Sequence, residues 1–171
     1  MEGAGRVLAV GADVEQVTPG QVVAWAMTNG SAATYAVVPA RACVPVPDDV
    51  DPVVAAAVLL QGMTAQFLTT DTHPVREGTV ALVHAAAGGV GQLLVQLLKA
   101  KGATVIATAG SAEKCATAAA RGADHTIDYS EVDDLAAAIR AVTPDGRGVD
   151  VAYDGVGAAT FDASLASLRP R

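Results

Sequence analysis

The residues best suited to chemistry lie in one short stretch, Val80-Ala-Leu-Val-His-Ala-Ala-Ala-Gly-Gly-Val-Gly-Gln92. Within it, Ala86-x-Gly88-x-x-Gly91 matches the dinucleotide fingerprint, with alanine in the first glycine position. The free N–H groups and positive dipole end of a helix N-terminus attract a pyrophosphate. A side chain at Gly88 would block that approach, and Gly91 lets the helix pack closely on the strand. The stretch predicts a nucleotide site; the alternative is a tight turn that binds nothing.

The end of the next predicted strand indicates which nucleotide would bind. Many NAD-binding domains carry an acidic residue there, which hydrogen-bonds the adenosine ribose. This chain instead has Thr108-Ala-Gly-Ser111, followed by Lys114 one helical turn later. A hydroxyl, a helix N-terminus and an ammonium group could hold a 2′-phosphate, which favours NADP(H). Alternatively, Ser111 is a simple helix N-cap and Lys114 a solvated lysine.

These motifs need a framework of parallel strands, and the second part of the chain predicts one. Ser111 and Ser130 are placed as helix N-caps. An alternation of strands and helices of this kind implies right-handed crossovers and a doubly wound α/β sheet of about four strands. The predicted strands are 79–85, 104–109, 125–128 and 149–153, and the predicted helices are 90–101, 112–121, 131–142 and 161–168.

The first fifty residues predict a different architecture. Short runs with β-branched residues at 6–10, 21–26 and 34–38 are separated by turn residues, as in an antiparallel barrel or sandwich. The proline-rich segment 43–47 is expected to be an extended exit from this unit. Beyond Asp51, a plausible N-cap, two helices are expected at 53–60 and 62–71.

Composition excludes several classes of protein. The chain has 171 residues, a net charge of −7 and a pI of about 4.7, with no basic run, which argues against a nucleic-acid partner. Cys43 and Cys115 are too few for a disulfide framework or a cysteine zinc site, so both are expected to be reduced. The longest apolar stretches are far below the roughly 20 residues of a membrane helix. With no signal peptide recognised, we expect a cytoplasmic protein without a membrane partner.

A series of short stretches carries a more specific signal. Taken together, they resemble the zinc-independent quinone oxidoreductases (NADPH:quinone reductases) of the medium-chain dehydrogenase/reductase superfamily. The stretches keep the order of that family and cover nearly the whole chain: Glu2-Gly-Ala-Gly5, Gln61-Gly-Met-Thr-Ala-Gln66, His84-Ala-Ala-Ala-Gly-Gly-Val-Gly91, Gly122-Ala-Asp-His125, Gly148-Val-Asp-Val151, Tyr153-Asp-Gly-Val-Gly157 and Ser167-Leu-Arg-Pro-Arg171.

The resemblance implies two domains and an activity. Residues 1–50 would be part of a GroES-like catalytic domain, and residues 51–171 a Rossmann-type NADP(H)-binding domain truncated at its C-terminal end. The activity implied is hydride transfer from NADPH to a small quinone or other conjugated carbonyl. Since this family's proteins are considerably longer, the chain would be an internal piece of one, and the full-length protein a homodimer.

The resemblance also implies roles for particular residues. Thr64 would face the nicotinamide, and Gly155 would lie near the adenosine and its ribose. No catalytic acid or base is identified. The other residues implied in cofactor binding are those of the turn and of the 2′-phosphate side: Ala86, Gly88, Gly89, Val90, Gly91, Ser111, Lys114 and Tyr129.

No metal is expected. Zinc-dependent relatives carry a histidine ligand where this chain has Met1 and a cysteine ligand near Gln61, and neither Met nor Gln is a usual zinc ligand. His73, His84 and His125 are dispersed along the sequence and are expected to be structural. Two alternatives remain: an enoyl-thioester reductase of the polyketide or fatty-acid type, and a nucleotide-binding piece without catalytic activity of its own.

Overall fold

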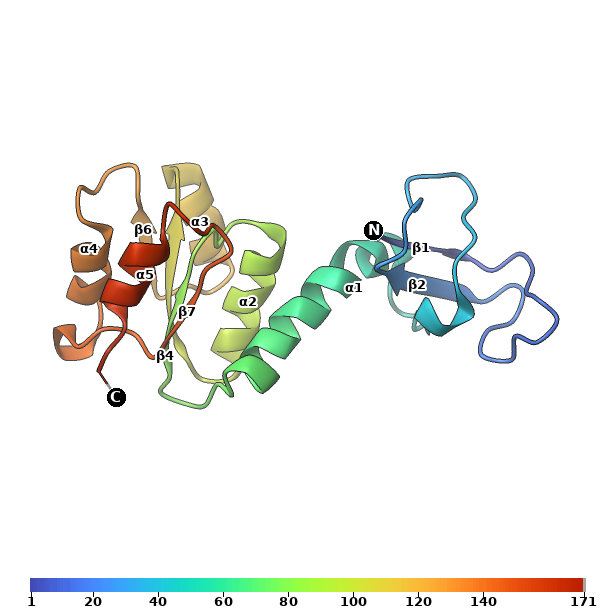
Figure 1. The fold of residues 1–171 in the computed structure, drawn as a ribbon, viewed down its shortest axis with the longest axis horizontal. Helices are drawn as coiled ribbons and strands as arrows, with labels where there is room; N and C mark the ends of the chain where they lie inside the picture. The colour runs from blue at the N-terminus through green and yellow to red at the C-terminus, as the bar shows by residue number, and fades with distance from the viewer. Residues whose placement is uncertain (171) are drawn as a thin grey trace. The chain divides into compact units, whose positions relative to one another are not determined.

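The computed structural model describes residues 1–170 and divides them into two compact units, Met1–Met63 and the part from Thr64 onward. The division falls inside a long helix, whereas the sequence pattern changes near residue 50. Each unit has its own sheet (Figure 1). The sheet of the first unit is antiparallel and that of the second is parallel.

The second unit is a doubly wound α/β sheet, as the sequence predicts. Its strands lie in the order β6-β5-β4-β7 and every neighbouring pair is parallel. Strands and helices alternate along the chain: β4 (Val80–Val83), α2 (Gly89–Ala100), β5 (Thr104–Ala109), α3 (Ala112–Ala120), β6 (His125–Asp128), α4 (Leu135–Ala141), β7 (Val151–Tyr153) and α5 (Phe161–Ser167).

Alternation along the strands divides the core between the two faces of this sheet. Ala81 and Val83 of β4 join the cluster that α2 covers, and Val80 and Leu82 join the cluster that contains Ile139 of α4. In Figure 1, α2 lies on one side of the strands and α4 with α5 on the other. Strand order reverses between β4 and β7, so the sheet has a topological switch point there, and such points are where ligands bind.

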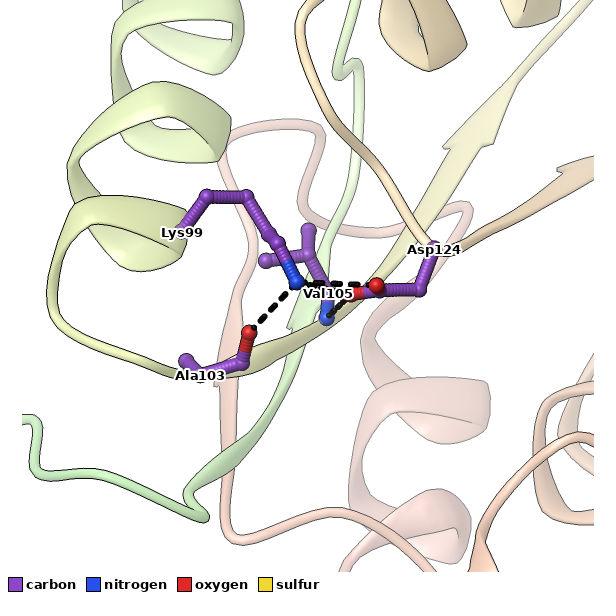
Figure 2. A network of polar contacts seen from close by, with 4 residues as sticks. All are labelled: Lys99, Ala103, Val105 and Asp124. Carbon is purple, nitrogen blue, oxygen red and sulfur yellow. Dashed lines mark hydrogen bonds and ion pairs between the residues drawn. The ribbon is translucent and has the colours of Figure 1, made fainter.

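A lysine–aspartate contact joins α2, β5 and β6 near the amino ends of the strands (Figure 2). Lys99 Nζ donates to both carboxylate oxygens of Asp124 at 2.8 Å and to the Ala103 carbonyl at 3.0 Å. The same carboxylate accepts the Val105 N–H at 2.7 Å. One ion pair, between Lys99 and Asp124, therefore links the end of α2 to the starts of β5 and β6.

The first unit contains β1 (Glu2–Arg6), β2 (Val22–Ala26) and β3 (Cys43–Pro45), with a short 3₁₀ helix at Ala40–Ala42. β2 pairs antiparallel with both neighbours. Its buried residues form a small cluster with the loop before it: Val17, Val23 and Trp25.

Two strand predictions for this unit were wrong. The first strand ends at Arg6 rather than running over 6–10, and segment 34–38 forms no strand. Tyr35 is 76% exposed and Val37 98% exposed, and within this segment only Val38 packs against the core of the unit. β3 forms instead in the segment that was expected to be only an extended exit, because it pairs with Val23–Trp25. Pairing with a distant strand overrides local propensity here.

The two helices expected at 53–60 and 62–71 are one helix, α1 (Pro52–Phe67), continued by a π-helical turn, Leu68–Thr72. Gly62 is accommodated inside the helix. In the π turn, Thr69 Oγ1 donates to the Ala65 carbonyl at 2.9 Å and to the Gln66 carbonyl at 3.1 Å. These hydroxyl contacts satisfy carbonyls that the wider turn leaves without their usual helical partners.

This continuity corrects the expectation that every apolar stretch is too short to span a membrane. Pro52–Thr72 is a helix of 21 residues, and its most apolar window has a mean hydropathy of 1.5 and is 17% buried. By length and composition alone it could cross a membrane. The core helix of a soluble protein meets the same criterion.

The predicted N-cap at Ser111 is confirmed, but the one at Ser130 was wrong. Ser111 accepts the Lys114 N–H at the start of α3. α4 begins at Leu135, and Asp134 is its N-cap, accepting the Ala137 N–H at 2.9 Å. Ser130 Oγ instead donates to Asp128 at 2.6 Å, so that residue belongs to the turn after β6.

Candidate functional site

A cleft of about 560 Å³ opens at the carboxyl ends of β4 and β7, beside the N-terminus of α2. This is the switch point of the sheet, and all the residues that line the cleft belong to the second unit. They are Thr64, Leu68, Thr72, His84, Ala85, Gly88, Gly89, Val90, Gly91, Leu94, Val151, Ala152, Tyr153, Asp154 and Gly155.

The turn from β4 into α2 is built to keep side chains out. Gly88 N–H donates to the Ala85 carbonyl at 2.9 Å, and Ala85 has a positive φ of 49°, which is unusual for a residue with a side chain. A Cβ on Gly91 would lie 2.4 Å from the Ala85 carbonyl oxygen and 2.8 Å from Ala86 Cα. Only glycine fits at position 91, as the fingerprint predicts.

The N-terminus of α2 is suited to an anion. Gly88 is its N-cap and offers no side chain to the first turn. The first N–H groups of a helix have no intrahelical partner, and they carry the positive end of the helix dipole. The N–H groups of Gly89 and Val90 belong to this first turn, and both residues line the cleft. The arrangement suits a phosphate or diphosphate.

The residues proposed for the adenosine side lie beside the cleft, at the end of β5. Ser111 and Lys114 share the first turn of α3. The Tyr129 hydroxyl lies 2.5 Å from the position that a Cβ on Gly110 would take, so its ring lies against the turn between β5 and α3. Ser111, Lys114 and Tyr129 therefore lie around one turn.

The structure thus separates the predicted site residues into two groups. Those that line the cleft are Thr64, Gly88, Gly89, Val90, Gly91 and Gly155. Ala86 is fully buried under the turn, where its N–H donates to the Thr108 carbonyl at 3.1 Å. Ser111, Lys114 and Tyr129 form the second group, at the end of the neighbouring strand.

A buried polar network beside the cleft was not predicted. His84 Nδ1 lies 2.7 Å from Thr108 Oγ1, and His84 Nε2 lies 3.1 Å from Ser164 Oγ. Ser164 Oγ donates to Asp154 Oδ2 at 2.7 Å. A partial signal was in the sequence: His84 continues the β4 alternation on the face of Leu82, and Asp154 stands in the Tyr153–Gly157 stretch. Ser164, on α5, carried no such signal.

Burial and hydrogen bonding shift the pKa values of the acidic and basic members of this network. Burial lowers the pKa of His84, and the charge of Asp154 opposes this shift only in part. Burial raises the pKa of Asp154, but hydrogen bonds from the Gly157 N–H, Ser164, Thr160 and the Val156 N–H outweigh it. The pKa of Asp154 is held well below its usual range. At neutral pH, the network therefore contains an ionised aspartate and an uncharged histidine.

Tyr153 joins β7 to the π turn on the edge of the same cleft. Its hydroxyl donates to the Leu68 carbonyl at 3.4 Å, a long contact. Burial raises the pKa of Tyr153 to about 12, so the phenol keeps its proton at neutral pH. The side chain therefore acts as a hydrogen-bond donor there, not as a base.

Comparison with known families matches both units. Residues 1–48 match the alcohol dehydrogenase GroES-like domain, and residues 89–171 match the zinc-binding dehydrogenase family. Together the two matches leave out only the region of α1, the π turn and β4, and the residues around them.

Individual relatives agree with these matches. A 2-haloacrylate reductase from a Burkholderia species is 42% identical over 99% of this chain and 51% of its own length. A quinone oxidoreductase from Pseudomonas aeruginosa is also 42% identical, over 99% of this chain and 52% of its own. The chain spans about half the length of the curated relatives it matches.

Solved structures share the fold over the same span. The Escherichia coli quinone oxidoreductase complexed with NADPH is 36% identical, with a TM-score of 0.95 over 99% of this chain and 52% of that one. The CurK enoyl reductase is 32% identical, with a TM-score of 0.89 over 99% of this chain and 50% of that one.

Proposed function

This chain belongs to the quinone oxidoreductase family of the medium-chain dehydrogenase/reductase superfamily, and we propose that it forms the NADPH-binding part of a zinc-independent reductase. The reaction is hydride transfer to a quinone or another conjugated carbonyl. The observation that carries this proposal is the cleft at the switch point. Its turn leaves no room for a side chain at Gly91, and its helix N-terminus has no capping side chain.

The residues of the cleft and of the neighbouring turn after β5 have distinct roles in this proposal. The first N–H groups of α2 hold the diphosphate, and Ser111, Lys114 and Tyr129 hold the 2′-phosphate side of the adenosine. Gly155 lies beside the adenosine and its ribose, and Thr64 faces the nicotinamide. When bound, NADPH supplies the hydride, while the protein supplies orientation and electrostatics.

No acid or base is assigned to the reaction. Tyr153 keeps its proton because burial raises its pKa to about 12. His84 and Asp154 use their polar atoms within the buried network. No residue of this chain is therefore assigned as the proton donor: solvent can protonate a quinol oxygen, and an acid in another part of the full-length protein would serve equally well.

Zinc independence rests on the donor atoms that the chain offers. Within residues 1–170, no three His, Cys, Asp or Glu side chains gather closely enough to hold a metal ion. Gln61, near the place of a zinc ligand in zinc-dependent relatives, donates to Glu2 Oε1 at 3.3 Å. Metal analysis of the purified full-length protein tests this, and stoichiometric zinc required for turnover would contradict it.

Lys114→Ala tests the assignment of the 2′-phosphate. We expect it to weaken NADPH binding about ten-fold or more, because a charge-assisted hydrogen bond contributes roughly 1.5–3 kcal/mol. NADH, which lacks the 2′-phosphate, should bind the variant and the wild type equally. Titration calorimetry with both nucleotides measures the two effects. Lys101→Ala is the control, because Lys101 is the C-cap of α2, at the end of that helix away from the cleft. Equal losses for NADPH and NADH would contradict the assignment.

An enoyl-thioester reductase is the alternative reaction, favoured by the likeness to the CurK enoyl reductase. Turnover of a naphthoquinone and of an enoyl thioester by the full-length protein separates the two. We expect the quinone to be reduced faster, because quinone oxidoreductases are among the relatives that are up to 42% identical, whereas the CurK enoyl reductase is 32% identical. Faster reduction of the thioester would favour the alternative.

The remaining proposals concern the whole protein. We propose a homodimer that acts on a small molecule in the cytoplasm, without a nucleic-acid or membrane partner. The net charge of −7, with no basic run, supports the absence of a nucleic-acid partner. A second alternative is that this chain binds the nucleotide but lacks catalytic activity of its own. NADPH binding without quinone turnover by the isolated chain would favour it.

A further inference from the structure

Four side chains, three of them buried and the fourth, that of Asp154, partly buried, form a continuous line of hydrogen bonds across the sheet. Thr108 lies at the end of β5, His84 directly follows β4, Asp154 directly follows β7, and Ser164 lies on α5. Thr108 is fully buried, His84 is 3% exposed and Ser164 is 5% exposed. Since β5, β4 and β7 are neighbours, the line crosses three adjacent strand ends, including the switch point.

The direction in which protons are donated along this line follows from Asp154, its last member. Asp154 accepts the Val156 and Gly157 N–H groups at 2.9 Å, and the hydroxyl of Thr160 at 2.8 Å. A carboxylate with these donors has no proton to give, so Ser164 must donate its own proton to Asp154. The Ser164 oxygen is then free only to accept, which requires an N–H on His84 Nε2.

The other ring nitrogen is fixed by the same reasoning. A neutral imidazole with its proton on Nε2 has a lone pair on Nδ1. That lone pair must accept the hydroxyl proton of Thr108, 2.7 Å away. Every proton in the line therefore points the same way, from Thr108 through His84 and Ser164 to Asp154.

We propose that this one-way chain fixes His84 as the neutral Nε2–H tautomer and holds the Asp154–Gly157 turn in place for the cofactor, with Ser164 as the positioning residue. His84 and Asp154 line the cleft, and Asp154 is followed by Gly155. Ser164 is the only link between the two that this line contains. The part of this inference that concerns the cofactor rests on the proposed function.

The tautomer is measured directly by long-range ¹H–¹⁵N NMR of histidine-labelled protein at neutral pH. When His73 and His125 are both replaced by Gln, His84 is the one histidine that remains in the chain, so every labelled signal belongs to it. We expect the Nε2–H tautomer in this background and a population of the Nδ1–H tautomer once Ser164→Ala removes the constraint. Ser167→Ala is the matched control, because Ser167 is fully buried on the same helix but donates to the Ala163 carbonyl.

NADPH binding to the same variants measures the positioning role. Ser164→Ala should raise the Kd about three- to ten-fold, the effect of losing one hydrogen bond, and Ser167→Ala should leave it unchanged. If Ser164→Ala fails to fold, Thr108→Val tests the same line, with the hydroxyl-retaining Thr108→Ser as its control. We expect the Kd for NADPH to rise in Thr108→Val and to stay unchanged in Thr108→Ser.

The outcomes separate this inference from the proposed function. An Nδ1–H or doubly protonated His84 in the wild type overturns the hydrogen-bond chain, as does an unchanged tautomer in Ser164→Ala. An unchanged Kd in Ser164→Ala overturns the positioning role. A wild-type protein that does not bind NADPH overturns the proposed function and the positioning role with it. The tautomer then still decides whether the hydrogen-bond chain exists.

Discussion

Gly91 and Gly62 both stand inside helices, yet the space around them differs. A Cβ on Gly91 would meet the backbone of the β4–α2 turn at 2.4 Å, whereas a Cβ on Gly62 would meet nothing within 4 Å. Alanine is intrinsically the better helix residue at both positions. The surroundings of each glycine therefore decide whether a Gly→Ala substitution stabilises or destabilises the protein.

Gly91→Ala should destabilise the second unit by about 1–3 kcal/mol, the usual cost of forcing extra atoms into a packed site. NADPH affinity should fall with it, because the turn must open to relieve the contact with the Ala85 carbonyl. Urea unfolding followed through amide NMR signals of each unit measures the stability.

Gly62→Ala is the control and should stabilise its helix by about 0.5–1 kcal/mol. A Gly91→Ala variant as stable as the wild type, with unchanged NADPH affinity, would show that the close approach at Gly91 is not required.

At the residue scale, a role could be predicted where it is set by neighbouring residues in the sequence, and not where it is set by a distant contact. Gly88 and Gly91 were identifiable because a turn between a strand and a helix constrains its own sequence. Ser164 was not, because its role comes from a contact between α5 and His84, which is 80 positions away in the sequence. His84 was expected to be structural. The network agrees, although the residue also lines the cleft.

At the element scale, the contact between Lys99 and Asp124 fixes three element ends at once (Figure 2). Both side chains are 35% exposed, so solvent screens the ion pair and its contribution is modest. Partial burial raises the pKa of Asp124, but hydrogen bonds from Lys99 and from the Val105 N–H outweigh it, and the pKa is lowered.

Asp124→Asn should therefore reduce the stability of the second unit by about 1 kcal/mol at neutral pH. Because the folded-state pKa is lowered, the stabilisation is present above the ordinary value of 3.8 and is lost as the pH falls toward the folded-state pKa. Urea unfolding of both proteins between neutral pH and pH 3 measures the difference, which should shrink in acid.

Asp133→Asn, a change at an exposed carboxylate, is the matched control and should have little effect at any pH. A stability difference for Asp124→Asn that is absent at neutral pH, or that grows in acid, would contradict the role given to this contact.

The elements of the second unit were predictable because each strand and helix carries its own pattern and pairs in a regular order. Across the two units, three departures from the predicted elements have physical reasons. The single helix α1 absorbs Gly62 without a break, because a glycine weakens a helix by only about 1 kcal/mol. α4 starts late because Asp134 caps it. Segment 34–38 forms no strand because no neighbour pairs with it.

At the scale of the whole molecule, the chain matches two dehydrogenase domains and spans about half the length of its curated relatives. The residues that line the cleft all lie within the second unit. The proposed binding of NADPH can therefore be tested on this chain itself, and the proposed turnover is tested on the full-length protein.

The second unit also provides its own reference surface for such a test. A shallow depression at the opposite, amino end of the strands is lined by His73, Arg76, Glu77, Asp150 and other residues. It includes charged side chains and so could attract a nucleotide without specificity, but it lacks the helix N-terminus and the small-residue turn of the cleft. Shifts of amide NMR signals at the cleft therefore indicate specific binding of NADPH, whereas shifts at this depression indicate nonspecific binding.

An NMR titration of the ¹⁵N-labelled chain with NADPH tests the central claim most directly. We predict saturable shifts of the amide signals of Gly88–Gly91, Gly155 and the first turn of α3, with little change at Arg76–Thr79. No saturable shift, or shifts concentrated at Arg76–Thr79, would contradict the claim that this cleft binds NADPH.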